Sequence, residues 1–355
     1  MAEKKAKKSK IKSEKKRNDD IMDSSGEDDV NVFQPSKINW GCMISTGSTL
    51  LDLAICGQRK KWGGLPTGIL VEIAGESSSG KTALLTEIAA RGQKKGGDIF
   101  FCDPEARLDK EYAEITGLNI RDLGHYEQPD TVTEVFEFYN GWGVDPEVPN
   151  VFACDSLAAL STKMEMEDGD KMGMRRAKEF SEGLRKTCRS FAKKNVLMVC
   201  SNQIRDGGPN GSKTIPGGNA VPFYSSVRMR VSPGYPKSKI VKEKTIRGAK
   251  QKKVIGIQSL VKITKNSLDD PFREVPIFLV FGYGIDDVRG NLTWYKEANN
   301  SKKFILPDGT EQSSIDKAIE YVEENGLEKK LRIAVRKLWL EIEESFKTQR
   351  KPKEF

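Results

Sequence analysis

Gly75-Glu-Ser-Ser-Ser-Gly80-Lys81-Thr82 is the stretch that decides the fold of this chain. An apolar run at residues 69–74 precedes it, and residues 83–90, whose apolar side chains have helical spacing, follow it. A strand, a glycine-rich loop and a helix in this order make up a P-loop, which binds the phosphates of a nucleoside triphosphate. The sequence therefore predicts a P-loop nucleoside triphosphatase.

Each residue type in this loop has a task in holding a triphosphate. Glycines allow the backbone to wrap a phosphate with its N–H groups, and the N-terminus of the following helix favours negative charge. The Lys81 ammonium reaches the β- and γ-phosphates and is a candidate catalytic group, and the Thr82 hydroxyl can ligate Mg²⁺. The residues expected to contact ATP are therefore Gly75, Glu76, Ser77, Ser78, Ser79, Gly80, Lys81 and Thr82.

Two further strand-like runs lead into carboxylates of the kind that ATP hydrolysis needs. The run at 150–155 ends at Asp155, and the run at 98–103 is followed closely by Glu105. Because α/β sheets collect ligands at the carboxyl ends of their strands, both groups are expected at one edge. Asp155 is expected to hold Mg²⁺ with Thr82, the alternative being an aspartate that caps the next helix. Glu105 is the candidate base that activates the attacking water.

Apolar strand candidates recur through the central part of the chain, separated by segments compatible with helices. Continuous apolar runs are typical of a parallel sheet buried on both faces, so we expect an α/β fold with a mostly parallel central sheet flanked by helices. Gln203 follows the fourth run and is a candidate sensor of the γ-phosphate. The four candidates lie at 69–74, 98–103, 150–155 and 196–201.

Three later strand candidates lie closer together, and we expect them to be antiparallel additions to the edge of the sheet. They are 226–232, 256–265 and 275–281, with a Lys/Arg-rich linker at 237–253.

The two ends of the chain differ in composition from its middle. Residues 1–35 combine a Lys-rich block with acidic residues and very few apolar ones, which predicts a disordered charged tail. Such a tail either solubilises the chain or acts as an arm for nucleic acid or another partner. Helical periodicity near the other end predicts a small helical C-terminal domain. The predicted organisation is a tail at 1–35, a linker with a helical segment at 36–65, an ATPase core at 66–295 and a C-terminal domain at 296–355.

The composition restricts the class of protein. The chain has 355 residues, of which 37% are apolar, and we expect an intracellular protein without membrane contact because it shows neither a spanning segment nor a secretory leader. A net charge of +8 favours a polyanionic partner. The six cysteines form no Cys-x-x-Cys pair, and the single histidine excludes zinc chemistry that needs two.

Several further blocks match, in order and spacing, those of one family. They are Ser45-Thr-Gly-Ser48, Gly63-Gly-Leu-Pro-Thr-Gly68, the P-loop, Asp103-Pro-Glu105-Ala-Arg-Leu-Asp109-Lys-Glu-Tyr112, Asp155-Ser-Leu-Ala-Ala-Leu160, Ser201-Asn-Gln-Ile-Arg205, Gly217-Gly-Asn-Ala-Val-Pro-Phe-Tyr-Ser-Ser-Val-Arg228 and Lys262-Ile-Thr-Lys265-Asn266. The central part of the chain thus resembles the RecA-type homologous recombinases. The resemblance implies a RecA-like, DNA-dependent ATPase that forms a helical filament on single-stranded DNA and exchanges strands with homologous double-stranded DNA in recombination and repair. Single-strand-binding and loader proteins would be further partners.

The same resemblance implies ATP and Mg²⁺ as cofactors and assigns a role to each matching position. ATP would lie between neighbouring subunits of the filament. The implied roles are phosphate and Mg²⁺ binding by Lys81 and Thr82, catalysis by Glu105, adenine contact by Asp109 and Tyr112, Mg²⁺ binding by Asp155, γ-phosphate sensing by Gln203, and contact with the neighbour's ATP by Lys265.

Segments 163–176 and 204–218 match the two DNA-binding loops of the family. Glycine-rich backbone can follow a phosphate chain, and the cations of these segments can contact phosphates, although two mobile surface loops would have the same composition. The residues expected to bind DNA are Lys171, Met172, Arg175, Arg176, Arg185, Arg205, Lys213, Gly217, Gly218 and Asn219.

The chain departs from the bacterial pattern at two positions. Pro222 and Ser267 stand where bacterial members have lysines that reach ATP across the subunit interface, which leaves Lys265 and makes Arg228 a candidate substitute. These departures favour a divergent, phage-encoded member that acts in the cytoplasm of a bacterial host. Two alternatives use the same core: a ring helicase, and a DNA-coating filament protein in which ATP is structural.

Overall fold

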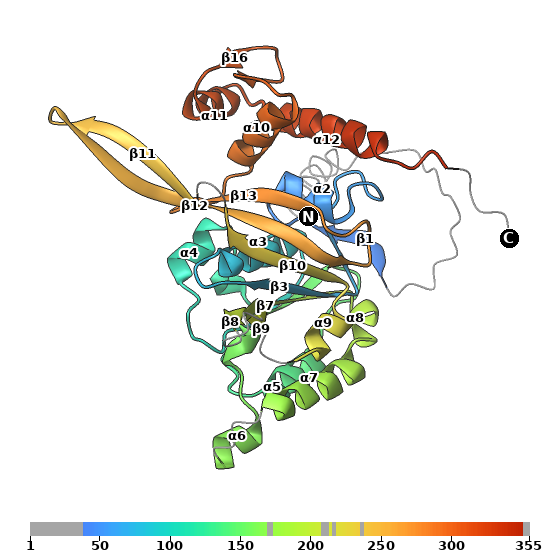
Figure 1. Cartoon of the computed structure of the whole chain (residues 1–355). Helices are drawn as coiled ribbons and strands as arrows, with labels where there is room; N and C mark the ends of the chain where they lie inside the picture. Colours follow the sequence, from blue (N-terminus) through green and yellow to red (C-terminus); the bar gives the residue numbers. More distant parts are fainter. Residues whose placement is uncertain (1–37, 169–172, 207–212, 215–217, 235–237, 351–355) are drawn as a thin grey trace, which may run out of the picture. The chain divides into compact units, whose positions relative to one another are not determined.

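The structure is a computed structural model that describes residues 38–168, 173–206, 213–214, 218–234 and 238–350. The chain divides into two units, Met1–Ser36 and Lys37–Phe355, and all described residues belong to the second. A ten-stranded sheet runs through this unit (Figure 1). The predicted tail at 1–35 lies outside the described residues, and the predicted domain boundaries stay predictions.

Parallel strands form the larger part of the sheet, as the apolar runs predicted. Each predicted run contains one observed strand, and polar side chains follow the strands at their carboxyl ends, where a ligand is expected. The α/β prediction is therefore confirmed. In sheet order the parallel strands are β10 (Val227–Pro233), β3 (Leu70–Gly75), β7 (Val196–Gln203), β6 (Asn150–Cys154), β4 (Ile99–Cys102) and β5 (His125–Glu127).

Antiparallel strands extend the sheet beyond β10. These are β12 (Ala249–Asn266), β13 (Glu274–Val280) and β14 (Gly284–Ile285), and β11 (Lys239–Ile246) pairs with β12 alone. Two expectations were wrong. The strand predicted at 226–232 is not an antiparallel addition, because β10 runs parallel to β3. The segment predicted as a linker at 237–253 forms, where it is described, all of β11 and the beginning of β12.

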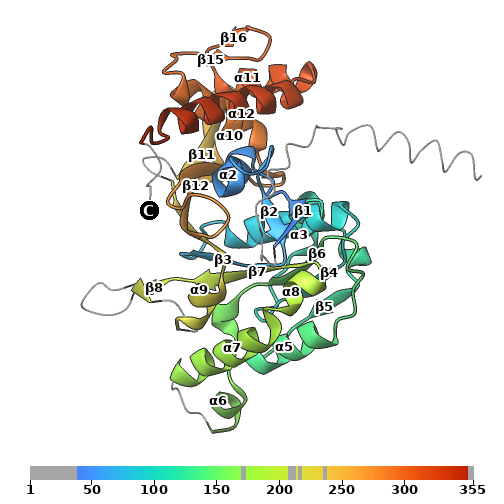
Figure 2. The same cartoon turned by 90° about the vertical axis from the view of Figure 1, so that its right-hand side faces the viewer.

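Alternate side chains of the central strands pack into two apolar cores, one on each face of the sheet. Helices cover both faces (Figure 2). Val71 and Ile73 of β3 belong to the core that includes α2 (Thr49–Cys56), α3 (Lys81–Lys94) and α4 (Lys110–Ile115). Leu70 belongs to the opposite core. That second core is built with α5 (Val132–Gly141), α7 (Gly173–Thr187), α8 (Ser190–Lys193) and α9 (Ala220–Tyr224).

The C-terminal helices pack on the first core, as Leu292, Val335 and Trp339 show. The helices that the periodicity near this end predicted are observed. The elements are α10 (Asp287–Ala298), α11 (Ile315–Glu324) and α12 (Glu328–Ser345), with the short strands β15 (Phe304–Ile305) and β16 (Glu311–Gln312) between the first two helices. Within the described ranges, no helix is both long enough and apolar enough to cross a bilayer.

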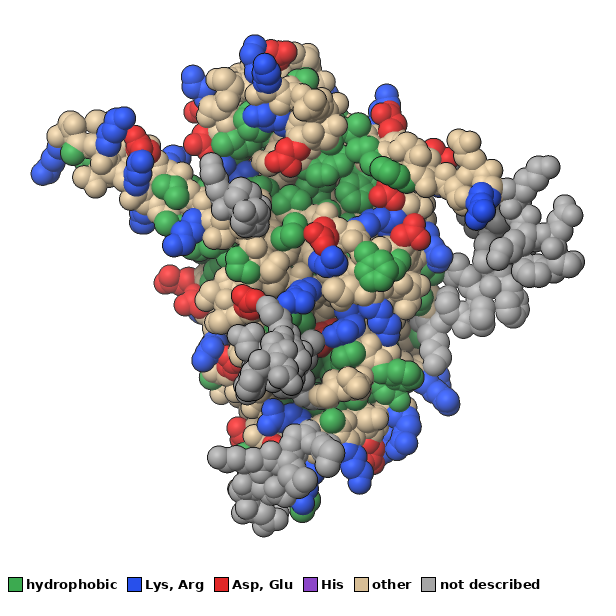
Figure 3. Space-filling model, in the orientation of Figure 1, with side chains coloured by type: hydrophobic (Ala, Val, Ile, Leu, Met, Phe, Trp, Pro, Cys, Tyr) green, Lys and Arg blue, Asp and Glu red, His purple; other side chains and the backbone are tan. Residues whose placement is uncertain are grey.

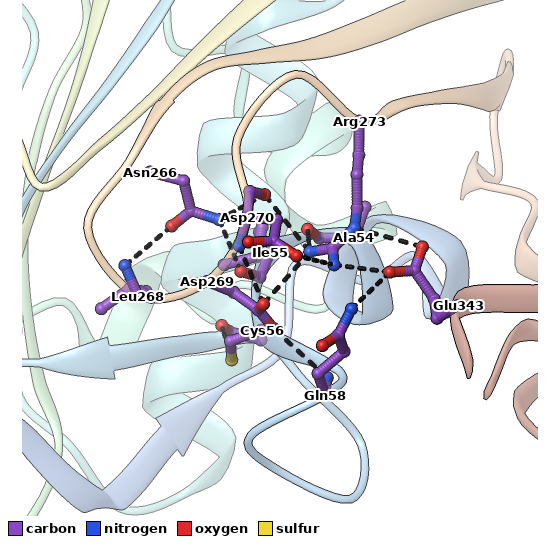
Figure 4. Close-up of polar contacts among 11 residues, drawn as sticks. Ala54, Ile55, Cys56, Gln58, Asn266, Leu268, Asp269, Asp270, Arg273 and Glu343 are labelled. Atoms are coloured by element: carbon purple, nitrogen blue, oxygen red, sulfur yellow. Dashed lines mark hydrogen bonds and ion pairs between the residues drawn. The ribbon is translucent and has the colours of Figure 1, made fainter. Parts of the chain in front are cut away.

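Arg273 ties α12 to the rest of the molecule (Figure 4). Its Nη2 lies 2.6 Å from Glu343 Oε2 of α12, and its Nη1 donates to Ala54 O of α2 at 3.2 Å. Asp269 and Asp270, in the turn between β12 and β13, complete the ion pairs at 3.5 and 3.4 Å. One half-buried guanidinium thus joins the last helix to an early helix and to the sheet, which fixes α12 against the core.

The segment predicted as a linker with a helix contains more structure than its sequence indicated. The helix is α2, as expected, but β1 (Asn39–Ile44) and β2 (Leu65–Thr67) form an antiparallel pair around it. Three short elements lie in the segments predicted to bind DNA: α6 (Lys163–Asp168), β8 (Arg205–Asp206) and β9 (Lys213–Thr214). The 3-10 helices η1 (Ile120–Asp122) and η2 (Leu157–Ala159) lie outside those segments.

Asp52 of α2 makes the stability of the fold depend on pH. Its buried carboxylate accepts hydrogen bonds from Ser45 Oγ at 2.5 Å and from Thr46 N and Oγ1, each at 2.7 Å. Burial outweighs these bonds and raises the pKa of Asp52 from 3.8 to about 6. Because the folded carboxyl binds its proton more tightly than the unfolded one, stability falls by about 3 kcal/mol in total as pH rises from well below 3.8 to well above 6.

Comparison with Asp52→Asn, which cannot titrate at this position, isolates the effect. The free energy of unfolding of the wild type minus that of the variant should be about 2 kcal/mol smaller at pH 7 than at pH 4. Equal differences at the two pH values would show that Asp52 keeps an ordinary pKa.

Candidate nucleotide and DNA site

The P-loop joins the end of β3 to the start of α3, and two of its positions require glycine. A Cβ atom on Gly75 would lie 2.3 Å from Val231 O of the neighbouring strand. Gly80 caps α3 with φ 94°, and a Cβ atom there would lie 2.3 Å from Leu279 Cδ1. Both positions therefore exclude a side chain, and the backbone can turn tightly there. The N-terminus of α3 lines a pocket that a phosphate can occupy.

Lys81 lies at the first turn of α3 and folds back over the loop. Its Nζ donates to Glu76 O at 2.7 Å, and Ser79 Oγ donates to the same carbonyl at 2.8 Å. Burial lowers the pKa of Lys81, while the carboxylates of Asp155, Glu105 and Glu76 oppose that shift. The ammonium is thus partly desolvated among acidic groups, an arrangement that strengthens its attraction for phosphate oxygens.

Asp155 and Thr82 come together as the sequence predicted. Asp155 follows β6, its carboxylate is hydrogen-bonded to Thr82, and it accepts a hydrogen bond from Ser201 Oγ of β7. Burial raises the pKa of Asp155, and the two hydroxyl hydrogen bonds and Lys81 lower it in part. A hydroxyl and a carboxylate are the hard oxygen donors that Mg²⁺ prefers, so the residues present fit that ion.

Glu105 lies at the same edge and contacts the candidate sensor. Its Oε1 accepts hydrogen bonds from Ser156 Oγ at 2.8 Å and from Gln203 Nε2 at 3.2 Å. Its Oε2 lies 2.7 Å from Arg107 Nη1. The structure therefore brings the candidate base, the candidate sensor and the P-loop into one cluster, because β3, β7, β6 and β4 are successive parallel strands whose carboxyl ends lie at one edge of the sheet.

A pocket of about 260 Å³ opens beside the P-loop on the side of α4. Tyr112 lines it, and burial raises the pKa of that phenol to about 12. Asp109 caps α4 by accepting from Tyr112 N at 2.7 Å, and its adenine contact stays a prediction. Other lining residues were missed from the sequence: Ile257, Leu279, Val280 and Phe281. Only the order of strands in the sheet could have indicated them, since β12 and β13 pass beside the P-loop and carry apolar side chains to it.

Lys265 does not join this pocket within one subunit. Its Nζ donates to Pro222 O at 3.0 Å and to Phe223 O at 2.8 Å, at the end of α9. Arg228, on the paired strand β10, is held by the buried carboxylate of Glu72, with Nε 2.6 Å from Oε2. The guanidinium is therefore engaged inside its own sheet, which disfavours Arg228 as the substitute that reaches a neighbour's ATP.

The two predicted DNA segments approach each other along α7. Gly218, at the end of the second segment, lies so close to α7 that a Cβ atom would come within 2.7 Å of Ala177 Cβ. The helices α7 and α9, which follow the two segments, lie side by side in both views (Figures 1 and 2). Arg176 Nη2 lies 3.3 Å from Glu165 Oε2 of α6, so a phosphate contact by Arg176 requires that this pair open.

The other residues predicted to bind DNA differ in exposure, and some of them lie outside the described residues. Arg185 is exposed on α7, Arg175 is half-buried on the same helix, and Asn219 is exposed just before α9. Arg205 lies on β8 and Lys213 on β9, and these strands pair as a short hairpin with Asp206 opposite Lys213. Lys171, Met172 and Gly217 lie outside the described residues.

Comparisons of the sequence with known proteins match this chain to one family. The model of the RecA N-terminal domain family matches residues 19–286. Protein RecA of Gluconobacter oxydans (strain 621H) is 34% identical over 307 residues, which cover 78% of this chain and 83% of that protein. Protein RecA of Azoarcus sp. (strain BH72) is 38% identical over 68% of this chain and 67% of its own length. Protein RecA of Thermus thermophilus is 37% identical and covers 69% of both chains.

Proposed function

The chain belongs to the RecA family, and from this premise we propose that its P-loop cluster hydrolyses ATP with Mg²⁺ while the segments 163–176 and 204–218 hold single-stranded DNA. The function of the family is homologous recombination, so the chain is a recombinase and, at the level of the family, a DNA-dependent ATPase. The observation that carries the proposal is the hydrogen bond between Gln203 and Glu105. It joins the candidate base to the strand that leads into the second DNA segment.

The residues of the cluster divide the chemistry between them. Lys81 neutralises charge on the β- and γ-phosphates, and Thr82 with Asp155 would hold Mg²⁺, which supplies further positive charge to the transferring phosphoryl group. Glu105 orients a water molecule and accepts its proton as the water attacks the γ-phosphorus and ADP leaves. Ser156 and Gln203 keep the Glu105 carboxylate in place by donating to Oε1.

The position of Gln203 also supports a coupling between nucleotide binding and DNA binding. It is the last residue of β7, opposite Gly75 in the parallel register, and Ile204 N donates to Gly75 O at 3.1 Å. A γ-phosphate that competes for the Gln203 amide would disturb the backbone that enters segment 204–218. The affinity for DNA and the occupancy of the nucleotide site would then be coupled in both directions.

Arg205→Ala tests the DNA path, because Arg205 lies two residues after Gln203 and its loss removes one cation from the second segment. Affinity for single-stranded DNA should fall, and the slope of log affinity against log salt should decrease by about 0.7. Stimulation of ATP hydrolysis by single-stranded DNA should weaken, while ATP affinity in the absence of DNA stays unchanged. Measurements with several unrelated DNA sequences should agree, since phosphate contacts do not depend on base identity.

Arg121→Ala is the matched control, because Arg121 is an exposed arginine in the short turn before β5. It should behave as the wild type in each assay. If Arg205→Ala and Arg121→Ala gave the same salt slope, the second segment would not be the DNA path.

A further inference from the structure

The strand β11 and the first part of β12 form a two-stranded hairpin that extends away from the sheet (Figure 1). We refer to residues 241–254 as the basic hairpin. Only β11 pairs with β12 over this length, since pairing with β13 begins at Gly256 and pairing with β10 begins at Ser259. Arg247 and Gly248 form the turn with φ 49° and 79°, as a two-residue type I′ turn requires. Every residue of the basic hairpin is exposed.

The charge of the basic hairpin is almost entirely positive, and blue side chains line it in the space-filling view (Figure 3). Glu243 is the single acidic residue. The cations are Lys242, Lys244, Arg247, Lys250, Lys252 and Lys253.

The strand alternation sorts these charges onto two unlike faces. Glu243 shares a face with Lys250 and Lys252 and forms an ion pair with each, with Nζ to carboxylate distances of 3.5 and 3.3 Å, so one of the two positive charges is offset. The other face carries Lys242 directly opposite Lys253, with Lys244 as the next residue on that face of β11. Among the described residues, no ion pair neutralises these three lysines.

This second face is unfavourable for an isolated hairpin. Like charges directly opposite each other on antiparallel strands destabilise the pair, and a two-stranded hairpin without an apolar face is marginally stable in water. A ligand with regularly spaced negative charges would remove the repulsion and order the hairpin at the same time. Phosphates along a nucleic acid backbone have this property.

The shape and composition of the hairpin favour a duplex over a single strand. A two-stranded β-ribbon fits the major groove of B-form DNA. Single-strand sites depend on aromatic side chains that stack on bases, whereas residues 239–256 contain no aromatic residue. Lysine is a point charge that contacts phosphate without reading a sequence, so binding to any duplex is possible.

We propose that the basic hairpin is an arm that binds double-stranded DNA through the Lys242, Lys244 and Lys253 face. The biological role of this binding rests on the proposed function, because a recombinase must hold a duplex of any sequence beside its single strand. The binding itself needs no ATP hydrolysis and is measurable alone.

The test is a triple variant, Lys242→Gln/Lys244→Gln/Lys253→Gln, titrated with fluorescent duplex DNA at several salt concentrations. Removal of three phosphate contacts should lower the salt slope by about 2.7 and weaken duplex binding about tenfold or more at low salt. Single-strand-stimulated ATP hydrolysis should remain at the wild-type level. The corresponding triple Lys→Arg variant should retain duplex affinity, which separates the role of charge from that of folding.

Two control variants distinguish the loss of this particular lysine face from a general loss of positive charge. Lys94→Gln/Lys95→Gln/Lys193→Gln removes the same charge from exposed positions at the ends of α3 and α8 and should leave duplex affinity near that of the wild type. Lys250→Gln/Lys252→Gln changes the two lysines on the face that carries Glu243. It should weaken duplex binding less than the triple Lys→Gln variant of the other face. Duplex affinity equal to the wild type in the first triple variant would overturn the proposal. If the wild type binds duplex DNA through the hairpin but exchanges no strands, the strand-exchange function is wrong. The assignment of the hairpin as a duplex-binding site then remains valid.

Discussion

Lys81→Ala is expected to abolish ATP-driven activity. Loss of the ammonium removes the positive charge that faces the β- and γ-phosphates, and it leaves the carboxylates of Asp155, Glu105 and Glu76 without their common cation. Phosphoryl transfer depends mainly on electrostatic stabilisation, so kcat should fall by about a hundredfold to a thousandfold, and ATP affinity should fall with it. Steady-state hydrolysis with and without single-stranded DNA, together with equilibrium ATP binding, measures both effects.

Lys95→Ala provides the comparison for this variant, because Lys95 is exposed at the C-terminal end of the same helix. Its rates should match those of the wild type. Residual turnover of Lys81→Ala within about threefold of the wild type would be incompatible with a P-loop site, since the loop lysine supplies the main protein cation at the phosphates.

Glu105→Gln should separate ATP binding from ATP hydrolysis. The amide oxygen of glutamine can still accept hydrogen bonds from Ser156 and Gln203, so the cluster keeps its shape, but it cannot take a proton from water. Hydrolysis should therefore fall by about a hundredfold or more, while ATP binding and filament formation on single-stranded DNA persist. Single-turnover kinetics and electron microscopy of the same sample test the two halves of this prediction.

Glu114→Gln serves as the control, because it makes the same substitution at an exposed position on α4. A loss of ATP binding in Glu105→Gln would mean that Glu105 is structural and that the ion pair with Arg107 holds the loop after β4. Wild-type hydrolysis in Glu105→Gln would require another base.

The core of the fold and most of the nucleotide site follow from local sequence features. Continuous apolar runs predicted β3, β4, β6 and β7, because strands buried on both faces leave few positions for polar side chains. The rule that ligands gather at the carboxyl ends of parallel strands was sufficient to bring Asp155, Glu105 and Gln203 to the P-loop.

The errors arise where the arrangement depends on distant parts of the chain. β10 was placed wrongly because the described part of its crossover from β7 holds a short helix, α9, and the two-residue strands β8 and β9, and the sequence there has no pattern of a long crossover helix. The basic hairpin was taken for a linker because strands exposed on both faces have no apolar alternation. Residues such as Ile257 and Phe281 reach the nucleotide pocket through strand pairing, which their own sequence does not indicate.

The central claim, that this chain is a strand-exchange recombinase, is tested most directly by a strand-transfer assay. The wild type is assembled on single-stranded DNA with ATP and Mg²⁺, and a labelled duplex of the same sequence is added. The account predicts that the labelled strand is transferred from the homologous duplex, that a heterologous duplex gives no transfer, and that Lys81→Ala gives none with either. A filament that hydrolyses ATP on single-stranded DNA but transfers no homologous strand would contradict the account.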